Sequence, residues 1–393
     1  MNEQKGSYRI IISGGGTGGH IFPAIAIARA LQQRESDMQI LFVGAKGKME
    51  MEKIPQAGYA IRALDIRGMD RGQWWKNITL PYFVLKSLLQ ARNILHEFKP
   101  HAVVGVGGYA SFPILFAAQQ KGIDTFIQEQ NSYAGKANQW LGKKATRVFV
   151  AYEGMDRFFP PEKIMITGNP VRQDILSTHI SRDEACRYFE LDPQLPVVLV
   201  VGGSQGARSI NLAILQKIEL LISHRIQLIW QTGKWNFEEI QQRLQSTTTS
   251  SSYHKQIKIM PFIDDMAKAY AAADVVVSRA GAIAIAELSV MQKPAILVPF
   301  PFAAEDHQTH NATMLVEQQA ACMISDAEAG EKLVPTIITL CVDEEKRNTL
   351  REHIRKWAIR DADQRIADAI LQVLQQKRYQ SSSSKQNPIN HHS

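Results

Sequence analysis

Short runs of β-branched and aliphatic residues alternate along the chain with longer stretches whose apolar positions have a helical period. This alternation is typical of βαβ units that build a parallel sheet. The strands predicted in the first half are Tyr8–Ile12, Gln39–Val43, Ala60–Leu64, Ala102–Val106, Thr125–Ile127, Arg147–Val150 and Ile164–Ile166. Those predicted in the second half are Pro196–Val201, Ile226–Ile229, Ile257–Met260, Asp274–Val277, Ala295–Val298 and Ala320–Met323. The clearest helical patterns cover Pro23–Gln33, Tyr82–Phe98 and Asp361–Gln376.

Each half of the chain opens with a strand, a glycine-rich turn and a helix. The first opening is IIISGGGTGGH at residues 10–20, and the second is VVLVVGGSQGAR at residues 197–208. Two Rossmann-like domains in tandem are the simplest interpretation, joined at residues 168–172, where Gly, Asn and Pro interrupt both periodicities. We therefore expect domains over residues 1–172 and 173–360, a helix at about 361–378 that packs back on the first domain, and a disordered tail over 379–393.

Composition and charge narrow the class of protein. The 393 residues are 45% hydrophobic and 21% charged, which suits two globular domains with apolar cores. The formal net charge of +7 suits a phosphate-bearing ligand or an anionic membrane surface, but it is too diffuse to indicate nucleic acid. The three cysteines have no paired or metal-type spacing, which favours a reducing compartment. The longest uncharged stretch, residues 102–120, is interrupted by Gly and Pro, so we expect a soluble or peripheral protein.

The first glycine-rich turn, Gly14 to His20, has the character of an anion-binding loop. Glycines after a buried strand bring backbone N–H groups close to a ligand, and the helix that follows adds partial positive charge. The turn formally matches a dinucleotide fingerprint, but the second strand ends in Gly44-Ala45-Lys46, without the carboxylate that holds a ribose. This argues against a nicotinamide enzyme. His20, at the mouth of the turn, suits either a general base or a structural cap, and its residue type leaves both open.

Two further stretches carry candidate chemistry in the second half. In the second glycine turn, Ser204 and backbone amides suit a diphosphate, with Arg172 or Arg208 adding charge, although no Walker A sequence is present. A helix beginning near Ala282 would place Glu287 where it either accepts both hydroxyls of a ribose or is simply solvated. His307 and His310 have no evident third ligand, so we expect no zinc site.

An aromatic and basic segment indicates contact with lipid. Between Arg62 and Lys99 the chain has seven basic and three acidic residues, with Trp74 and Trp75 in the middle. Aromatic side chains beside surplus basic charge suit an interfacial membrane patch. We expect only the end around Trp74 and Trp75 to contact lipid, and most of the 82–98 helix to be a core face.

Taken together, the motifs resemble the peptidoglycan N-acetylglucosaminyltransferases, the MurG family. The stretches that carry the resemblance, in the family's order, are GGGTGGHIFPA, GVGGY at residues 105–109, EQN at 129–131, GNPVR, GGSQGAR, PFIDDM at 261–266, SRAGA followed by AE, and DHQTHNA. The resemblance extends from Tyr8 to about Leu374. It implies the α/β GT-B fold, in which two Rossmann-like parallel-sheet domains face a cleft.

The resemblance also implies an activity. Domain 173–360 would bind UDP-N-acetylglucosamine, and domain 1–172 would bind lipid I, N-acetylmuramoyl-pentapeptide-diphosphoundecaprenol, and associate with the membrane. Transfer of N-acetylglucosamine to the acceptor 4-hydroxyl, with inversion and without a metal or other cofactor, would give lipid II for peptidoglycan. Such an enzyme is expected at the cytoplasmic side of the inner membrane, peripheral to its anionic surface, with cell-wall and division proteins as candidate partners.

The family's functional residues map onto positions of this chain. Its expected substrate contacts are Thr17, Gly18, Gly19, Asn131, Arg172, Ser204, Ile263, Ala282, Ile283, Ala284, Ile285, Ala286, Glu287 and Gln308. Among these, the backbone of Ile263 would read the uracil, Glu287 would hold the ribose and Gln308 the sugar hydroxyls. His20 becomes the leading candidate for the general base, with Glu129 as its rival.

The chain departs from the family pattern at two positions, and three alternative functions remain open. Ala284 stands where the family usually has Thr or Ser, and Gln128 where a His commonly precedes the Glu-Gln-Asn stretch. The alternatives are a related GT-B transferase with another lipid acceptor, a UDP-sugar epimerase, and a non-enzymatic nucleotide-binding module.

Overall fold

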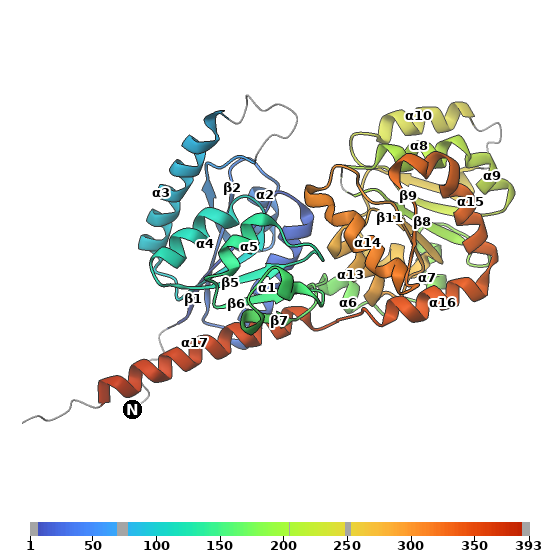
Figure 1. The fold of residues 1–393 in the computed structure, drawn as a ribbon. Coiled ribbons are helices and arrows are strands. Elements are labelled where there is room, and N and C mark those ends of the chain that lie inside the picture. Colours follow the sequence, from blue (N-terminus) through green and yellow to red (C-terminus); the bar gives the residue numbers. More distant parts are fainter. Residues whose placement is uncertain (1–6, 69–77, 204, 248–252, 387–393) are drawn as a thin grey trace, which may run out of the picture. The chain divides into compact units, whose positions relative to one another are not determined.

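The computed structural model describes residues 7–68, 78–203, 205–247 and 253–386, and Figure 1 shows their elements. The chain divides into two compact units. Unit 1 comprises Met1–Gln130, Ala134–Pro170 and Asp361–Ser393, and unit 2 comprises Asn131–Tyr133 and Val171–Arg360. Each unit has its own sheet and cores, so each is described by itself.

Unit 1 is built on a seven-stranded parallel sheet in the order β3-β2-β1-β4-β5-β6-β7. Its strands are β1 (Arg9–Gly14), β2 (Gln39–Ala45), β3 (Ala60–Leu64), β4 (Ala102–Gly107), β5 (Asp124–Glu129), β6 (Arg147–Val150) and β7 (Ile164–Ile166). Its helices are α1 (Gly18–Arg34), α2 (Glu50–Gln56), α3 (Leu80–Phe98), α4 (Ser111–Gln120), α5 (Lys136–Gly142) and α17 (Ala362–Gln386), with short 3₁₀ turns at Met155–Arg157 and Pro161–Lys163.

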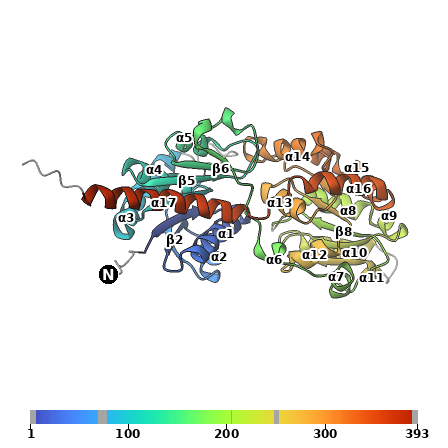
Figure 2. The same ribbon diagram turned by 90° about the horizontal axis from the view of Figure 1, so that it is seen from below.

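Side-chain alternation along β1 divides unit 1 into two cores. Ile10 and Ile12 belong to the core under α1 and α17, whereas Ile11 belongs to the core under α3, α4 and α5. The last helix, α17, packs along α1, as Figure 2 shows. Its apolar residues 366, 370 and 374 join the first core, and Lys377 forms an ion pair of 2.7 Å with Asp124. α17 continues to Gln386, into the segment 379–393 that the sequence led us to expect as disordered.

Unit 2 has a six-stranded parallel sheet in the order β10-β9-β8-β11-β12-β13. Its strands are β8 (Val197–Val201), β9 (Gln227–Gln231), β10 (Ile257–Met260), β11 (Val275–Ser278), β12 (Ala295–Leu297) and β13 (Cys322–Met323). Its helices are α6 (Gln173–Leu176), α7 (Arg182–Tyr188), α8 (Arg208–Gln216), α9 (Ile218–Ser223), α10 (Phe237–Thr247), α11 (Tyr253–Gln256), α12 (Met266–Ala272), α13 (Ala282–Val290), α14 (His307–Glu317), α15 (Ala329–Val342) and α16 (Glu344–Arg355), with 3₁₀ turns at Ala304–Asp306 and Asp326–Glu328.

Both sheets reverse their strand order at the same topological point. In unit 1 the neighbours of β1 are β2 and β4, and in unit 2 those of β8 are β9 and β11. In open parallel sheets, ligands bind outside the carboxyl ends of the strands at such switch points. The glycine-rich turns follow β1 and β8 directly, so each lies at the switch point of its own sheet.

All the predicted strands are present, and their ends differ from the prediction by a few residues at most. The helix over 82–98 is also present, as α3, but the prediction of its packing was wrong. Tyr82, Leu85 and Leu89 are 63%, 61% and 51% exposed, and the buried residues of α3 are Ser87, Ala91, Ile94 and Leu95. The helix therefore buries only a narrow stripe and presents an apolar one to solvent.

Candidate functional site

The first glycine turn of unit 1 is fixed by close backbone contacts with the loop after β4. Gly15 donates its N–H to the carbonyl of Gly107 over 3.3 Å. A Cβ atom at Gly108 would lie 2.3 Å from the carbonyl oxygen of Gly15, and Gly108 has a φ of +86°. Only glycine permits this approach and this backbone conformation, so the sequences GGG and GVGGY are two sides of one structure.

His20 lies between these two loops, in the first turn of α1. Its Nδ1 is 3.0 Å from the carbonyl oxygen of Val106. Because a carbonyl can only accept, Nδ1 carries the proton and Nε2 is the basic nitrogen of the neutral ring. A Cβ atom at Gly107 would be 2.6 Å from the imidazole, so the bare glycine makes room for the ring. The contact with Val106 therefore leaves Nε2 as the nitrogen able to accept a proton.

Glu129, the rival candidate for the base, is 3% exposed at the end of β5. Its Oε2 accepts hydrogen bonds from the N–H of Gly135 at 3.1 Å and from Nδ2 of Asn138 at 2.8 Å. These contacts tie the carboxylate to the start of α5. Sequence reasoning missed Asn138, which has no motif of its own and is recognisable only from its contact with Glu129.

In unit 2, Glu287 lies on α13, which begins at Ala282 as the sequence predicts. Glu287 is 9% exposed, and its carboxylate accepts a hydrogen bond of 3.0 Å from the hydroxyl of Tyr270. Burial raises the pKa of Glu287 to about 7, opposed by the positive charge of Arg172 and the bond from Tyr270. Arg172 also pairs with Asp174, with 3.1 Å between Nε and Oδ1. Tyr270 lies within the helix after PFIDDM and was not predicted as a site residue.

Two predicted donor contacts are already hydrogen-bonded within unit 2. The backbone N–H of Ile263 donates to Oε1 of Gln231 at 2.9 Å, so a uracil would have to displace or share that bond. Oε1 of Gln308 accepts from the backbone N–H of Phe300, also at 2.9 Å. This second bond orients the carboxamide of Gln308 from the loop after β12.

Residues 131–133 pack in unit 2 although they follow a strand of unit 1. The contact is organised by Asn311, which is fully buried on α14. Its Nδ2 lies 3.2 Å from Oδ1 of Asn131, and its Oδ1 accepts from the N–H and hydroxyl of Ser132, each at 3.0 Å. Tyr133 stacks on His310 with 5.2 Å between ring centroids. Asn311 belongs to the DHQTHNA stretch, but only these contacts distinguish it from its neighbours.

The remaining predicted residues divide into those that the structure places and those that it does not describe. Thr17 is the N-cap of α1, and Gly18 and Gly19 are its first two residues. The residues from Ala282 to Ala286 form the first turns of α13. Ser204, Trp74 and Trp75 lie outside the described residues. Within the described ranges, three or more His, Cys, Asp or Glu side chains nowhere gather in a way that would hold a metal ion.

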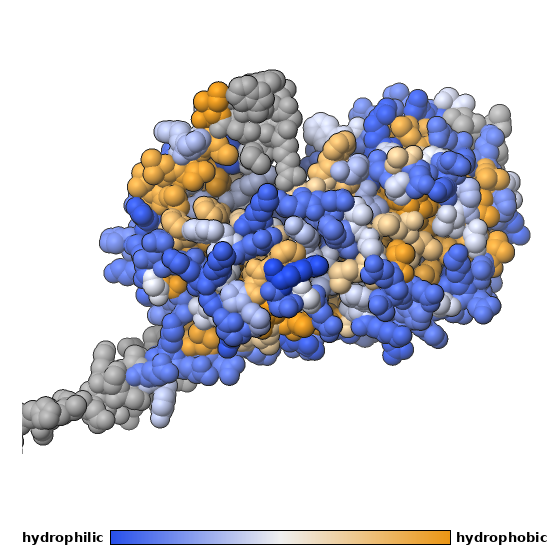
Figure 3. Space-filling view, viewed as in Figure 1, coloured by the Kyte–Doolittle hydropathy of each residue, from blue (hydrophilic) through white to orange (hydrophobic). Residues whose placement is uncertain are grey.

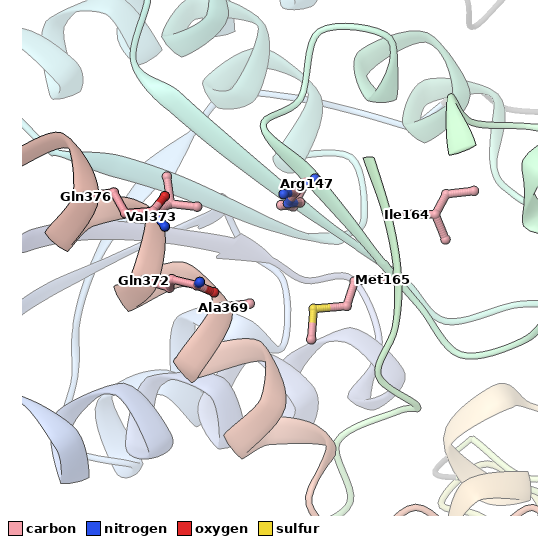
Figure 4. Close-up of a pocket in the computed structure, with 7 residues that line it drawn as sticks. All are labelled: Arg147, Ile164, Met165, Ala369, Gln372, Val373 and Gln376. Atoms are coloured by element: carbon pink, nitrogen blue, oxygen red, sulfur yellow. The ribbon is translucent and has the colours of Figure 1, made fainter. Parts of the chain in front are cut away.

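A pocket of about 330 Å³ lies elsewhere in unit 1, between α17 and the edge strand β7 (Figure 4). It is lined by Arg147, Ile164, Met165, Ala369, Gln372, Val373 and Gln376. The lining includes none of the predicted site residues and no carboxylate or imidazole. It therefore offers no general base, and we do not assign the reaction to it.

An apolar patch on unit 1 lies over α3, and Figure 3 shows it as a hydrophobic area of the surface. We call it the α3 patch and define it as Ile78, which lies just before α3, together with Tyr82, Leu85 and Leu89, whose spacing places them along one side of the helix. Basic groups lie around it: Lys86 pairs with Asp65 at 2.8 Å, and the guanidinium of Arg67 is 4.3 Å from the ring centroid of Phe83. Among the described residues, no helix combines the length and apolarity needed to cross a bilayer.

Comparison with known proteins gives a consistent result over almost the whole chain. Residues 10–150 match the glycosyltransferase family 28 N-terminal domain, and residues 197–373 match the family 28 C-terminal domain. Two similar proteins are the UDP-N-acetylglucosamine–N-acetylmuramyl-(pentapeptide) pyrophosphoryl-undecaprenol N-acetylglucosamine transferases of Cytophaga hutchinsonii and Bacteroides fragilis. They are 50% and 47% identical over 374 residues, which is 95% of this chain and 99% and 97% of theirs.

Solved structures agree with the sequence comparison. The crystal structure of Acinetobacter baumannii MurG is 28% identical, with a TM-score of 0.72, covering 93% of this chain and 99% of that one. A putative UDP-N-acetylglucosamine 2-epimerase from Listeria monocytogenes is 14% identical, with a TM-score of 0.67, covering 93% of this chain and 96% of that one. The second likeness shows the fold alone.

Proposed function

Since the chain belongs to the family of peptidoglycan N-acetylglucosaminyltransferases, we propose that it transfers N-acetylglucosamine from UDP-N-acetylglucosamine to lipid I, forming lipid II. The observation that carries this proposal is the identity of 50% and 47% to transferases of that name over 95% of the chain. The epimerase likeness is only 14% identical and concerns the fold, so it does not support the epimerase alternative. Two Rossmann-like α/β domains, as in other GT-B glycosyltransferases, supply the framework.

His20 is the general base in this proposal. Its Nδ1 donates to the carbonyl of Val106, which makes Nε2 the nitrogen that takes the proton from the acceptor 4-hydroxyl as that oxygen attacks the anomeric carbon. Glu129 is the weaker candidate because its carboxylate already accepts bonds from Gly135 and Asn138. We assign Glu129 to the support of the loop around residues 131–138. Inversion follows from a single displacement.

Unit 2 binds the donor in this proposal. The carboxylate of Glu287 accepts the ribose hydroxyls, the backbone of Ile263 reads the uracil, and Gln308 and Asn131 contact the sugar. The first turns of α13, residues 282–286, together with Arg172 and Ser204, hold the diphosphate, and Thr17, Gly18 and Gly19 contribute to donor binding from unit 1. The helix N-terminus and the guanidinium provide positive charge for the departing UDP, which is the role a metal plays in other transferases.

The α3 patch is the membrane-binding surface in this proposal. Exposed aliphatic and aromatic side chains next to cations insert into the headgroup region of an anionic bilayer, and about 1 kcal/mol of attraction comes from each basic residue near the surface. In the sequence, Trp74 and Trp75 precede the residues of the patch. In this proposal the enzyme works at the cytoplasmic face of the inner membrane, where lipid I is presented and where division-complex proteins are candidate partners.

The test is to measure UDP release from UDP-N-acetylglucosamine, with and without a short-chain lipid I analogue, in the presence of EDTA. We expect release that requires the acceptor and survives EDTA. Acceptor-independent release, or a reaction that stops when metal is removed, would contradict the proposed transfer mechanism. Conversion of the nucleotide sugar into an epimer without release would favour the epimerase alternative.

A further inference from the structure

We propose that Glu50 is a positioning residue that holds the first glycine turn, and through it His20, in the conformation needed for proton transfer. Glu50 is the first residue of α2 and is fully buried. Its two carboxylate oxygens each accept a backbone hydrogen bond, Oε2 from Gly16 at 2.8 Å and Oε1 from Ala45 at 2.9 Å. One side chain thus joins the turn after β1 to the end of β2.

The glycines around the Glu50 carboxylate leave the space that this side chain fills. A Cβ atom at Gly15 would lie 2.2 Å from Oε1 of Glu50, and one at Gly44 would lie 2.5 Å from its Cγ. Gly15 does not have a positive φ, so at that position the carboxylate, and not backbone strain, is the main obstacle to alanine. Two glycines, one directly after β1 and one within β2, are therefore explained by the space that Glu50 occupies.

The hydrogen bond between Gly16 and Glu50 also limits the ability of the first glycine turn to bind an anion. Gly16 has a φ of +88° and directs its N–H toward Glu50, so this donor is used inside the protein. A buried carboxylate close to the turn also repels a phosphate placed against the same N–H. The turn thus differs from the glycine-rich turn of a dinucleotide-binding domain, whose N–H groups face the pyrophosphate. It also supports the start of α1, since the carbonyl of Thr17 accepts from the backbone N–H of His20 at 3.1 Å.

A carboxamide cannot replace this carboxylate. Both oxygens of Glu50 face N–H donors, and in Glu50→Gln one of the two positions becomes an NH₂ that opposes an N–H. The substitution keeps size and shape but breaks one side of the link. Glu52 provides a matched control two residues away on α2, because its side chain is 70% exposed and Glu52→Gln makes the same chemical change.

The inference rests on the proposed function of His20, so its test separates the two. We expect Glu50→Gln to lower kcat by about 10- to 100-fold, the loss that follows a displacement of a catalytic group by about 1 Å. The affinity for UDP should stay within about twofold, since the Glu287 region of unit 2 is untouched. Glu52→Gln should change neither. Calorimetric titration with UDP checks that unit 2 is folded, and the dispersion of the unit 1 glycine amides in ¹⁵N-glycine-labelled protein checks that unit 1 is folded.

An NMR spectrum reports the conformation of the first glycine turn independently of catalytic activity. In ¹⁵N-glycine-labelled protein, the Gly16 amide should shift in Glu50→Gln and not in Glu52→Gln. An unmoved Gly16 amide together with normal kcat would overturn the inference. If the wild-type enzyme shows no acceptor-dependent UDP release, the proposed function fails, and the Gly16 amide still decides whether Glu50 holds the turn.

A double-mutant cycle provides a second test that does not depend on Glu50→Gln being folded. Gly15→Ala should lower kcat by at least about tenfold in the wild type because its Cβ meets the carboxylate. In the Glu50→Ala background the same change should have an effect of less than about twofold, since the space is then vacant. Equal effects of Gly15→Ala in the two backgrounds would contradict the proposed contact.

Discussion

The two glycine-rich turns begin the same way in sequence but are held by opposite kinds of contact. In unit 1 the side chain of Glu50 accepts from the N–H of Gly16. In unit 2, side chains donate to the turn's carbonyls: Gln231 Nε2 lies 3.0 Å from the oxygen of Gly203, and Asn236 Nδ2 lies 3.4 Å from that of Gln205. A carboxylate accepts hydrogen bonds from N–H groups that would otherwise bind an anion. Side-chain amides that donate to carbonyls leave the N–H groups of the turn available for an anion. This difference supports the proposal that the second turn, and not the first, binds the diphosphate.

The largest expected effect comes from removing the base. His20→Ala should lower kcat by about 100- to 10,000-fold, the usual contribution of general base catalysis. UDP affinity should stay within about twofold because the nucleotide is held by unit 2. Turnover and calorimetric UDP binding test the two halves of this statement, with His224→Ala, an exposed histidine of unit 2, as control. Near-normal turnover of His20→Ala would return Glu129 to consideration.

Removing the ribose contact should affect donor KM more than kcat, the opposite of the effect expected for His20→Ala. Glu287→Gln keeps the shape of the side chain but loses a charge-assisted bond, which corresponds to about 1.5–3 kcal/mol, or roughly 10- to 100-fold in donor KM. We expect kcat to change less than donor KM. Steady-state kinetics with varied UDP-N-acetylglucosamine measure both, and Glu317→Gln, an exposed residue of α14, is the control. Unchanged donor KM would contradict the assignment of Glu287.

Membrane association should depend on unit 1. Replacing both Leu85 and Leu89 with serine should weaken binding to anionic vesicles by about tenfold or more, since each buried leucine side chain contributes about 1.5–3 kcal/mol. The control is Val342→Ser in unit 2, an aliphatic side chain that is 75% exposed. Vesicle sedimentation measures the affinity. Equal binding of the double variant and the wild type would remove the α3 patch as the membrane surface.

Donor binding should weaken as the pH falls. Burial raises the pKa of Glu287 to about 7, so its carboxyl becomes protonated below that pH and loses one acceptor for the ribose. Donor KM should therefore rise by up to about tenfold per pH unit below the pKa and be flat above it, because only the ionised form accepts both hydroxyls. In Glu287→Gln this dependence should be absent. A pH profile of the variant that matches the wild type would show that another group is responsible.

The smallest expected effect concerns Tyr270. Its hydroxyl bond lowers the pKa of Glu287 against the effect of burial, so Tyr270→Phe should raise that pKa and move the donor-KM profile toward higher pH. Donor KM at pH 7 should rise by about two- to fivefold, consistent with the loss of one hydrogen bond. The same pH series performed on the variant tests this. A profile displaced toward lower pH would contradict the contact between the two side chains.

The elements that sequence predicted well are those whose burial is imposed by the fold. The central strands of both sheets, such as β1 and β8, are nearly continuous β-branched runs because they are covered on both faces. The helix over 82–98 was also found, yet its packing was not. An apolar stripe with helical spacing has the same pattern whether it faces a core or a membrane, and Tyr82, Leu85 and Leu89 face outward.

Residues of the candidate site could be predicted where they stand in recognisable motifs. Residues whose role depends only on tertiary contacts could not be predicted. His20 and Glu287 stand in recognisable stretches, and the resemblance to the family identified both. Glu50 and Glu52 are alike in sequence, two acidic residues at the start of a short helix, but only Glu50 is buried against the glycine turn. Tyr270, Asn138 and Asn311 likewise acquire their roles only from the tertiary contacts that bring them to Glu287, Glu129 and Asn131.

The most direct test of the account is to identify the lipid product. The enzyme is incubated with UDP-N-acetylglucosamine and a short-chain lipid I analogue, and the extracted lipid is analysed by mass spectrometry and NMR. The account predicts one added N-acetylglucosamine, β-linked to the 4-hydroxyl of the muramoyl sugar, and almost none of it with His20→Ala. Unmodified acceptor with intact, hydrolysed or epimerised nucleotide sugar, or undiminished product with His20→Ala, would contradict it.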